Sequence, residues 1–307
     1  MAAKKSSVSK IKLKGVDTLF GIEESEQDEV REVRLSELKS FEDHPFQVIR
    51  DEKMEDLMES ISEHGVLVPG LARPNTKGQE RYELIAGHRR KFACQELQLT
   101  TMPVLIRDMT DDEAIVAMVD SNIQREKLLY SEKAFAYRMK YEALKRQGNR
   151  SDRTLVQLGP KLEKRWAAEL VGNEVGENIS AIKRYIRLTY LEKELLRLVD
   201  KGTLAFTVGV ELSYLKFPEQ KCLLAFMNET GIVPQGTQAR EMKEASRERG
   251  LGEEKIQTIM LKPKAEIEKI KISGKKLRQY FPADYSQKQM EEIIFHLLED
   301  WKRNSGR

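Results

Sequence analysis

Residues Gly87 to Lys91 join a glycine to a run of cationic side chains, Gly-His-Arg-Arg-Lys. Alternating residues before Gly87 predict a strand, and a helix is predicted to begin directly after it. The helix would carry Arg89, Arg90 and Lys91 in its first turn, where cations oppose the helix dipole. A bound anion would remove this conflict, because backbone N–H groups and guanidinium groups would meet on one phosphate. A solvated basic helix face is the alternative, and the chemistry alone favours neither.

A second polar constellation lies at Asp120-Ser-Asn-Ile-Gln-Arg-Glu126, where a predicted helix ends. Asn122, Gln124 and Arg125 could bind a ligand, or they could simply terminate the helix. If this segment lies beside the arginine turn, the two together could close around a phosphate.

Residues 166–188 have the spacing of a helix-turn-helix. Small apolar residues supply a first helix, a turn follows at 175–177, and Asn178 can cap a second helix. Ser180, Ala181, Lys183, Arg184 and Arg187 are predicted on the outer faces of that helix, where they could contact DNA. The segment 138–165 adds nine Lys and Arg against three Asp and Glu. The alternative is an ordinary helical hairpin with a solvated basic face.

The elements that would position these residues fall into blocks. Residues 1–28 read as a charged, disordered tail with five lysines in its first 14 residues. Residues 29–126 alternate strands and helices, which predicts a small mixed sheet. Residues 127–236 read as all-helical, with Ser131 expected to cap one helix and Gly148 to follow its end. Residues 237–307 read as a charged linker and a C-terminal helix at 286–301, whose apolar face suits self-association or a local core.

Composition limits the possible functions. The chain has 307 residues, 40% of them hydrophobic and 34% charged, with a net charge of only +3, which excludes a uniformly basic, histone-like protein. The two cysteines, Cys94 and Cys222, belong to no Cys/His cluster, so a zinc site is not expected. The scarcity of cysteine instead predicts a reducing, cytoplasmic location. No apolar run approaches the roughly 18–20 residues of a membrane span, so no membrane partner is expected.

Three segments in order resemble the ParB-type partition proteins: His64-Gly-Val-Leu-Val-Pro69 with Arg73-Pro74, Ala86-Gly-His-Arg-Arg90 with Ala93, and Asn122-Ile-Gln-Arg-Glu126. The resemblance covers residues 30–215 and implies an α+β fold: a sulfiredoxin-like mixed-sheet domain, an all-helical helix-turn-helix domain and a small C-terminal helical unit. It also implies a site for cytidine triphosphate (CTP) and magnesium, weak hydrolysis, and a clamp that closes on DNA.

The same resemblance suggests roles for individual residues. It implies that Gly87, His88, Arg89, Arg90 and Arg125 lie at the nucleotide, and that Asn122 helps to hold the metal. The family often has Glu where this chain has His88, and Glu before the Asn where this chain has Ser121. Because magnesium prefers anionic oxygen, Asp120 or Glu126 would have to supply the missing carboxylate. Nucleotide binding is therefore expected, and hydrolysis is left open.

The expected function is partition of a plasmid or mobile element by a homodimer that binds a centromere-like site in double-stranded DNA, with a ParA-type ATPase as partner. A helix-turn-helix transcriptional regulator without clamp activity is the second candidate, and a nucleotide-dependent phosphoryl-transfer enzyme on the same fold is the third. Sulfiredoxin chemistry is excluded, because the reactive cysteine of that enzyme would stand at the position of Gly87.

Overall fold

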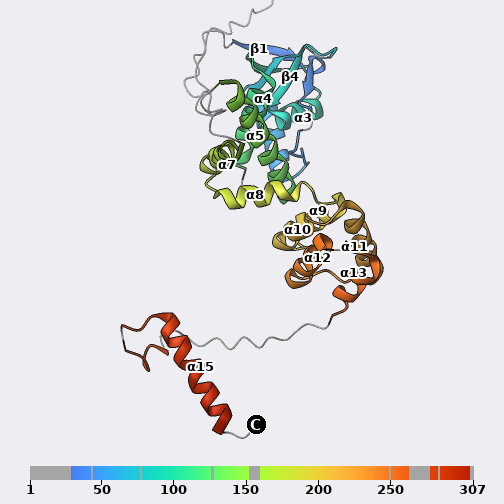
Figure 1. Cartoon of the computed structure of the whole chain (residues 1–307). Coiled ribbons are helices and arrows are strands. Elements are labelled where there is room, and N and C mark those ends of the chain that lie inside the picture. Colours follow the sequence, from blue (N-terminus) through green and yellow to red (C-terminus); the bar gives the residue numbers. More distant parts are fainter. Residues whose placement is uncertain are drawn as a thin grey trace, which may run out of the picture. The chain divides into compact units, whose positions relative to one another are not determined.

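The computed structural model describes residues 29–42, 44–76, 78–125, 128–151, 160–248, 250–262, 277–282 and 284–304; the side chains of 148–151 and 160–166 are not described. The described residues separate into two compact units at Leu261/Lys262 (Figure 1). The predicted tail, residues 1–28, lies outside the described residues.

The first unit begins with a five-stranded mixed sheet in the order β1-β5-β3-β4-β2. Its strands are β1 (Glu29–Arg34), β2 (Leu38–Ser40), β3 (Gly70–Pro74), β4 (Tyr82–Ala86) and β5 (Thr101–Ile106). β1 pairs with β5 and β3 with β4 in antiparallel register, whereas β3–β5 and β2–β4 are parallel. The mixed sheet predicted from the alternating pattern is therefore present.

Helices cover both faces of this sheet. α2 (Glu52–His64) and α3 (His88–Glu96) pack on one face through a core that includes Met54, Leu84 and Ala93. α4 (Asp111–Ile123) and α5 (Tyr130–Ser151) cover the other face, where Met118 and Ala136 meet Ile85. All five residues of β4 are buried, because this strand is covered on both sides.

The start of α5 differs from the prediction. Ser131 lies inside the helix and does not cap it; its backbone N–H donates to Asp200 Oδ1 at 2.9 Å. The side chain of Glu132 instead accepts from the backbone N–H of Leu129 at 3.0 Å. The helix also continues past Gly148 to Ser151, since one glycine weakens a helix without necessarily ending it.

The helix-turn-helix is formed by α7 (Pro160–Val175) and α8 (Ile179–Leu188). Its turn requires two glycines. Gly176 has φ +70°, and a Cβ on Gly172 would lie 2.5 Å from the carbonyl oxygen of Glu177. Ala168, Val171 and Ile182 pack with Tyr137 of α5 in a small core, which fixes α8 against α5 and α7.

The helices that follow pack around one core, which also includes Leu188 of α8 and Ala134 of α5. They are α9 (Lys193–Asp200), α10 (Phe206–Leu212), α11 (Phe217–Thr230), α12 (Gly236–Glu248) and α13 (Glu253–Met260). The prediction of a charged linker from residue 237 is thus partly wrong, because Ala239, Met242 and Ile256 are fully buried in this core. These apolar residues recur at helical spacing within a charge-rich run, so composition alone concealed them.

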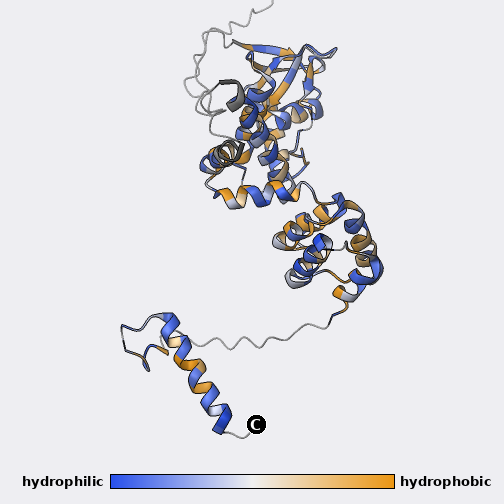
Figure 2. Cartoon of the chain, viewed as in Figure 1, coloured by the Kyte–Doolittle hydropathy of each residue, from blue (hydrophilic) through white to orange (hydrophobic). Residues whose placement is uncertain are grey.

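The second unit contains α15 (Gln287–Asn304), which confirms the predicted C-terminal helix. The hydropathy colouring of its ribbon shows hydrophobic residues recurring along the helix between hydrophilic ones (Figure 2). Phe295, Leu297 and Trp301 are each more than 60% exposed. Within the part of the chain that the structure describes, no helix combines the length and apolar character needed to cross a membrane.

Candidate functional site

The Gly87 turn occupies the carboxyl end of β4, at the N-terminus of α3. Gly87 has φ +105°, a left-handed conformation that favours glycine, and an added Cβ would lie 3.1 Å from Cα of Gly70. Since the first N–H groups of a helix have no partner within the helix, this turn presents a group of donors and a partial positive charge.

The three cations after His88 have different surroundings. Arg89 donates to Oδ1 of Asp51 at 2.9 Å. Arg90 donates to the carbonyl oxygens of Val68 and Pro69 at 2.5 and 2.6 Å, and Lys91 donates to the carbonyl of Leu38 at 2.5 Å. Arg90 and Lys91 therefore hold backbone segments of the fold. Arg89, whose side chain is 25% exposed, is the one of the three best placed to meet an incoming anion.

Arg125 faces this turn from the end of α4. Its guanidinium lies 5.7 Å from the centre of the Phe46 ring. Burial lowers its pKa, and the charge of Arg89 lowers it further, whereas Glu132 acts in the opposite direction. The two guanidinium groups are thus close enough to repel each other. A polyanion bound between them would offset this repulsion, because both groups would be attracted to it.

Asn122 is buried, and its amide nitrogen donates to the Met118 carbonyl at 2.8 Å and to Ser121 Oγ at 3.1 Å. Its carbonyl oxygen is the atom able to take a cation. Asp120 does not compensate for the missing carboxylate, because it pairs with Lys140. Glu126 lies outside the described residues, so its predicted role as a metal ligand stays a prediction. Among the described residues, no group of three or more His, Cys, Asp or Glu could hold a metal.

His88 is 9% exposed and has a low pKa of about 3, caused by burial first and then by the positive charges of His44, Lys91 and Arg125. The ring of His44 lies beside it, with 4.0 Å between the centroids. Sequence reasoning missed His44. It stands in a loop 44 residues before His88 with no motif around it, so only the tertiary structure reveals it.

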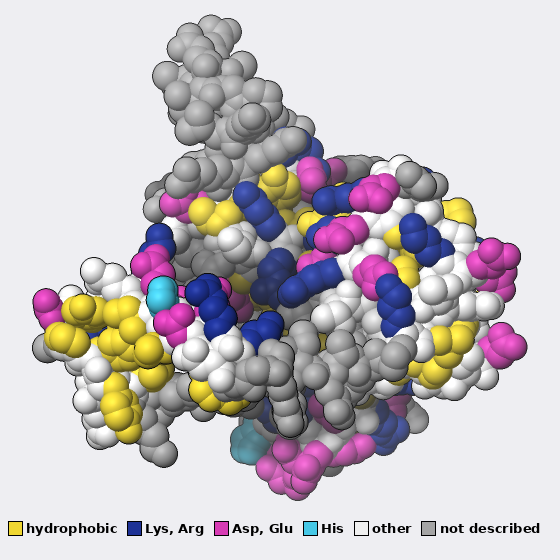
Figure 3. Space-filling model, turned by 60° about the horizontal axis from the view of Figure 1, so that its bottom comes forward, with side chains coloured by type: hydrophobic (Ala, Val, Ile, Leu, Met, Phe, Trp, Pro, Cys, Tyr) yellow, Lys and Arg dark blue, Asp and Glu magenta, His cyan; other side chains and the backbone are white. Residues whose placement is uncertain are grey.

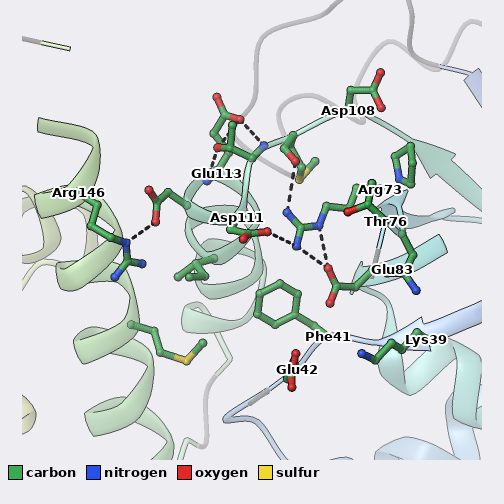
Figure 4. Close-up of a pocket in the computed structure, with 17 residues that line it drawn as sticks. Lys39, Phe41, Glu42, Arg73, Thr76, Glu83, Asp108, Asp111, Glu113 and Arg146 are labelled. Atoms are coloured by element: carbon green, nitrogen blue, oxygen red, sulfur yellow. Dashed lines mark hydrogen bonds and ion pairs between the residues drawn. The ribbon is translucent and has the colours of Figure 1, made fainter. Parts of the chain in front are cut away.

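A cleft of about 1000 Å³ lies at the opposite end of the sheet (Figure 4). Its Arg73 is bound to Glu83 and Asp111 at 2.6 and 2.7 Å and to the Met109 carbonyl at 3.3 Å. Six acidic residues line the cleft against three basic ones, a poor setting for a triphosphate. The size of the cleft therefore does not make it the phosphate site.

The second candidate surface is α8. Asn178 caps the helix by accepting from the backbone N–H of Ala181 at 2.8 Å. Ser180, Lys183 and Arg184 are exposed, and Ala181 is half-buried. The guanidinium of Arg184 lies 5.0 Å from the centre of the Phe206 ring. These exposed side chains are placed as a recognition helix would need them.

Arg187 lies on the same helix in a different setting. Its Nη2 donates to the Ser213 carbonyl at 2.5 Å, and its guanidinium packs against the rings of Tyr190 and Tyr214 at 4.8 and 4.1 Å. These contacts connect α8 to the segment after α10. Of the two roles open to Arg187, DNA contact or support of the fold, this geometry favours support.

Four basic side chains of the segment 138–165 are described, and three of them are engaged within the protein. Lys140 is fully buried and pairs with Asp120 of α4 and Glu174 of α7. Arg146 pairs with the buried Asp112 at 2.7 Å, and Arg138 donates to Thr189 at 3.0 Å. Lys140, one of the nine cations of this segment, is therefore held inside the fold and is not placed to contact DNA phosphates. On the face shown in Figure 3, acidic side chains stand beside many of the basic ones.

Comparisons with known proteins agree with these motifs. The family model described as ParB N-terminal domain matches residues 21–123. A probable chromosome 1-partitioning protein ParB of Deinococcus radiodurans is 33% identical over 76% of this chain and 71% of its own length. Stage 0 sporulation protein J of Bacillus subtilis is 29% identical over 66% of this chain and 64% of its own.

Two solved structures of Caulobacter crescentus ParB are also similar. One, complexed to the centromeric parS site, is 22% identical over 70% of this chain and 98% of that chain, with a TM-score of 0.38. The other, complexed with CTP-gamma-S, is 27% identical over 62% and 94%, with a TM-score of 0.30. The family is shown by the sequence relatives, which together span both the mixed-sheet domain and the helix-turn-helix: this chain belongs to the ParB family of partition proteins.

Proposed function

We propose that this chain is a DNA-binding partition protein that takes CTP at the N-terminus of α3 and a centromere-like DNA site at α8. The observation that carries the proposal is the glycine-linked N-terminus of α3, where Arg89 stands within electrostatic range of Arg125 from a second motif far along the sequence. Family membership supplies cytidine as the base, and Asn122 is the residue of the described site that would hold Mg²⁺. The clamp, the homodimer and the ParA-type ATPase partner belong to the same proposal.

The nucleotide site is tested by calorimetry with CTP, ATP and UTP in the presence of Mg²⁺. Arg89→Ala removes a charge-assisted contact worth about 1.5–3 kcal/mol, so the affinity for CTP should fall by roughly 10- to 150-fold. Arg81→Ala is the matched control, because Arg81 is exposed at the other end of β4. An unchanged affinity in Arg89→Ala, or equal affinity of the wild type for all three nucleotides, contradicts the proposed site.

The DNA surface is tested with a randomised DNA library at two salt concentrations. Arg184→Ala should cost roughly 1–3 kcal/mol at the selected site and relax the choice of one base. Lys183→Ala should instead weaken binding to all sequences and reduce the salt dependence by about one phosphate contact. Arg197→Ala, an exposed arginine on α9, is the control. If Arg184→Ala binds the same sequences with full affinity, α8 is not the recognition helix.

Clamp activity separates a partition protein from a simple regulator. With CTP, a clamp should accumulate on DNA whose two ends are blocked and should leave when one end is opened. A regulator should show the same occupancy on the blocked DNA and on the opened DNA.

The exposed apolar side of α15 is a candidate surface for the homodimer, and Trp301→Glu should shift the sedimentation of the chain toward that of a monomer.

A further inference from the structure

Two histidines form an unusual pair at the start of α3. His88 is the first residue of the helix, and His44 comes from the loop before α2. Three of their ring nitrogens, Nε2 of His44 and both nitrogens of His88, are buried and have no hydrogen-bond partner among the described residues. Buried polar atoms of this kind are rare in folded proteins, and each one calls for an explanation such as a ligand.

The charges around the pair favour an anion over a metal cation. Arg125 faces both rings from the end of α4, and Lys91 faces His88 from α3. Glu132 on α5 is the acid that faces His44, and its carboxylate also accepts from the backbone N–H groups of Gln47 and Leu129. Burial lowers the pKa of both histidines, so both rings are neutral at pH 7 in the free protein.

The hydrogen bond of His44 limits what its other nitrogen can do. Nδ1 of His44 lies 2.8 Å from the Phe46 carbonyl oxygen, and because a carbonyl only accepts, Nδ1 must carry the proton. In the neutral ring Nε2 is then an acceptor. An ionised phosphate oxygen is also an acceptor, so the two cannot form a hydrogen bond unless a proton is added to the ring.

We propose that the His44–His88 pair takes up a proton when a triphosphate binds at the N-terminus of α3, and that nucleotide affinity therefore rises as the pH falls. The inference rests on the proposed function and adds a regulatory property to the same site. The triphosphate brings several negative charges beside the rings, which reverses the repulsion from Arg125 and Lys91. The added proton turns Nε2 of His44 into a donor to the phosphate.

The sign of the effect follows from linkage. The pKa of the pair is low in the free protein and raised in the complex, so the complex holds more protons between those two values. Across that pH range the dissociation constant should increase by up to about tenfold for each unit of rising pH. The nucleotide's own terminal phosphate, with a pKa near 6, would act in the opposite direction, because binding to cations favours its deprotonated form.

The test measures the number of protons exchanged when CTP binds with Mg²⁺, at pH 6.5 and at pH 8. Calorimetry in two buffers of different ionisation enthalpy gives this number at each pH. We expect uptake of up to one proton at pH 6.5 and less at pH 8. His44→Gln and His88→Gln should each reduce the proton uptake and flatten the pH dependence of the CTP affinity. His296→Gln, at an exposed histidine on α15, is the control and should leave the uptake unchanged.

The outcomes are distinct. CTP binding without proton uptake, or with the same uptake in His44→Gln, overturns this inference and leaves the proposed function standing. If neither CTP, ATP nor inorganic triphosphate binds the wild type at any pH, both fail. Proton uptake that disappears in His44→Gln and persists in His296→Gln supports the inference.

Discussion

Lys140→Met tests the ion-paired cluster that joins the two candidate sites. Lys140 on α5 is completely buried and pairs with Asp120 of α4 and Glu174 of α7. α4 carries Asn122, and α7 is the first helix of the helix-turn-helix. Methionine keeps most of the aliphatic stem of lysine and removes the charge, so the change isolates the electrostatic contribution.

The magnitude follows from the burial of the three groups. Two opposite charges about 4 Å apart attract by roughly 4 kcal/mol near a protein surface. Removing one member of a buried pair costs about 3–5 kcal/mol, because the remaining charge stays without a partner. Asp120 and Glu174 keep 33% and 49% of their side chains exposed, so water recovers part of this loss. We expect Lys140→Met to lower the free energy of unfolding by about 3 kcal/mol at pH 7.5.

Urea unfolding at pH 7.5 and pH 5 provides the measurement. Burial raises the pKa of Asp120, although its bond to Lys140 acts against this, so without Lys140 the pKa should rise further. A carboxyl group whose pKa is higher in the folded state than in the unfolded state adds stability as the pH falls. The loss caused by Lys140→Met should therefore be smaller at pH 5 than at pH 7.5.

Two further variants make the result decisive. Lys145→Met makes the same substitution on the same helix, at a half-buried lysine that forms no ion pair with a described carboxylate, and should cost less than about 1 kcal/mol. Asp120→Asn combined with Lys140→Met should recover part of the loss, since it removes one of the two stranded charges. A cost below 1 kcal/mol for Lys140→Met, or a double variant less stable than the single one, would refute the electrostatic account.

Three other substitutions test contacts on α8 and in the helical core. Arg187→Met should lower stability by about 1.5–3 kcal/mol in thermal or urea unfolding, because it removes hydrogen bonds to Ser213; a loss of DNA affinity at unchanged stability would instead assign Arg187 to DNA. Asn178→Ala removes the cap of α8 and should cost about 1 kcal/mol, with a matching rise in amide exchange in the first turn of that helix. Glu219 has a lowered pKa: burial would raise it, but bonds from Ser246, Lys216 and Leu251 outweigh this. Its stabilisation should therefore be complete above the unfolded pKa of about 4.3 and lost as the pH falls through the folded value, and Glu219→Gln should remove that part of the acid sensitivity.

The sequence by itself determined the local elements and the order of the motifs. The backbone freedom of Gly87 acts within a few residues, so the start of α3 was predicted close to where it lies. The limits of α8 were predicted correctly for the same reason, since its cap and its apolar spacing are both local. The ordered motifs also identified the family, because their residues and spacing are read directly from the chain.

The tertiary structure decided which of these residues are available for function. Arg90, Lys91, Lys140 and Arg187 read as free cations in the sequence, yet each has contacts with groups far along the chain. The pairing of His44 with His88 and the meeting of Arg125 with Arg89 depend on packing across the sheet. Charge and side-chain type are local properties that can be read from a sequence. Burial and interaction partners arise only when distant segments pack together. Burial and partners decide whether a charged side chain is used within the fold or is left for a ligand.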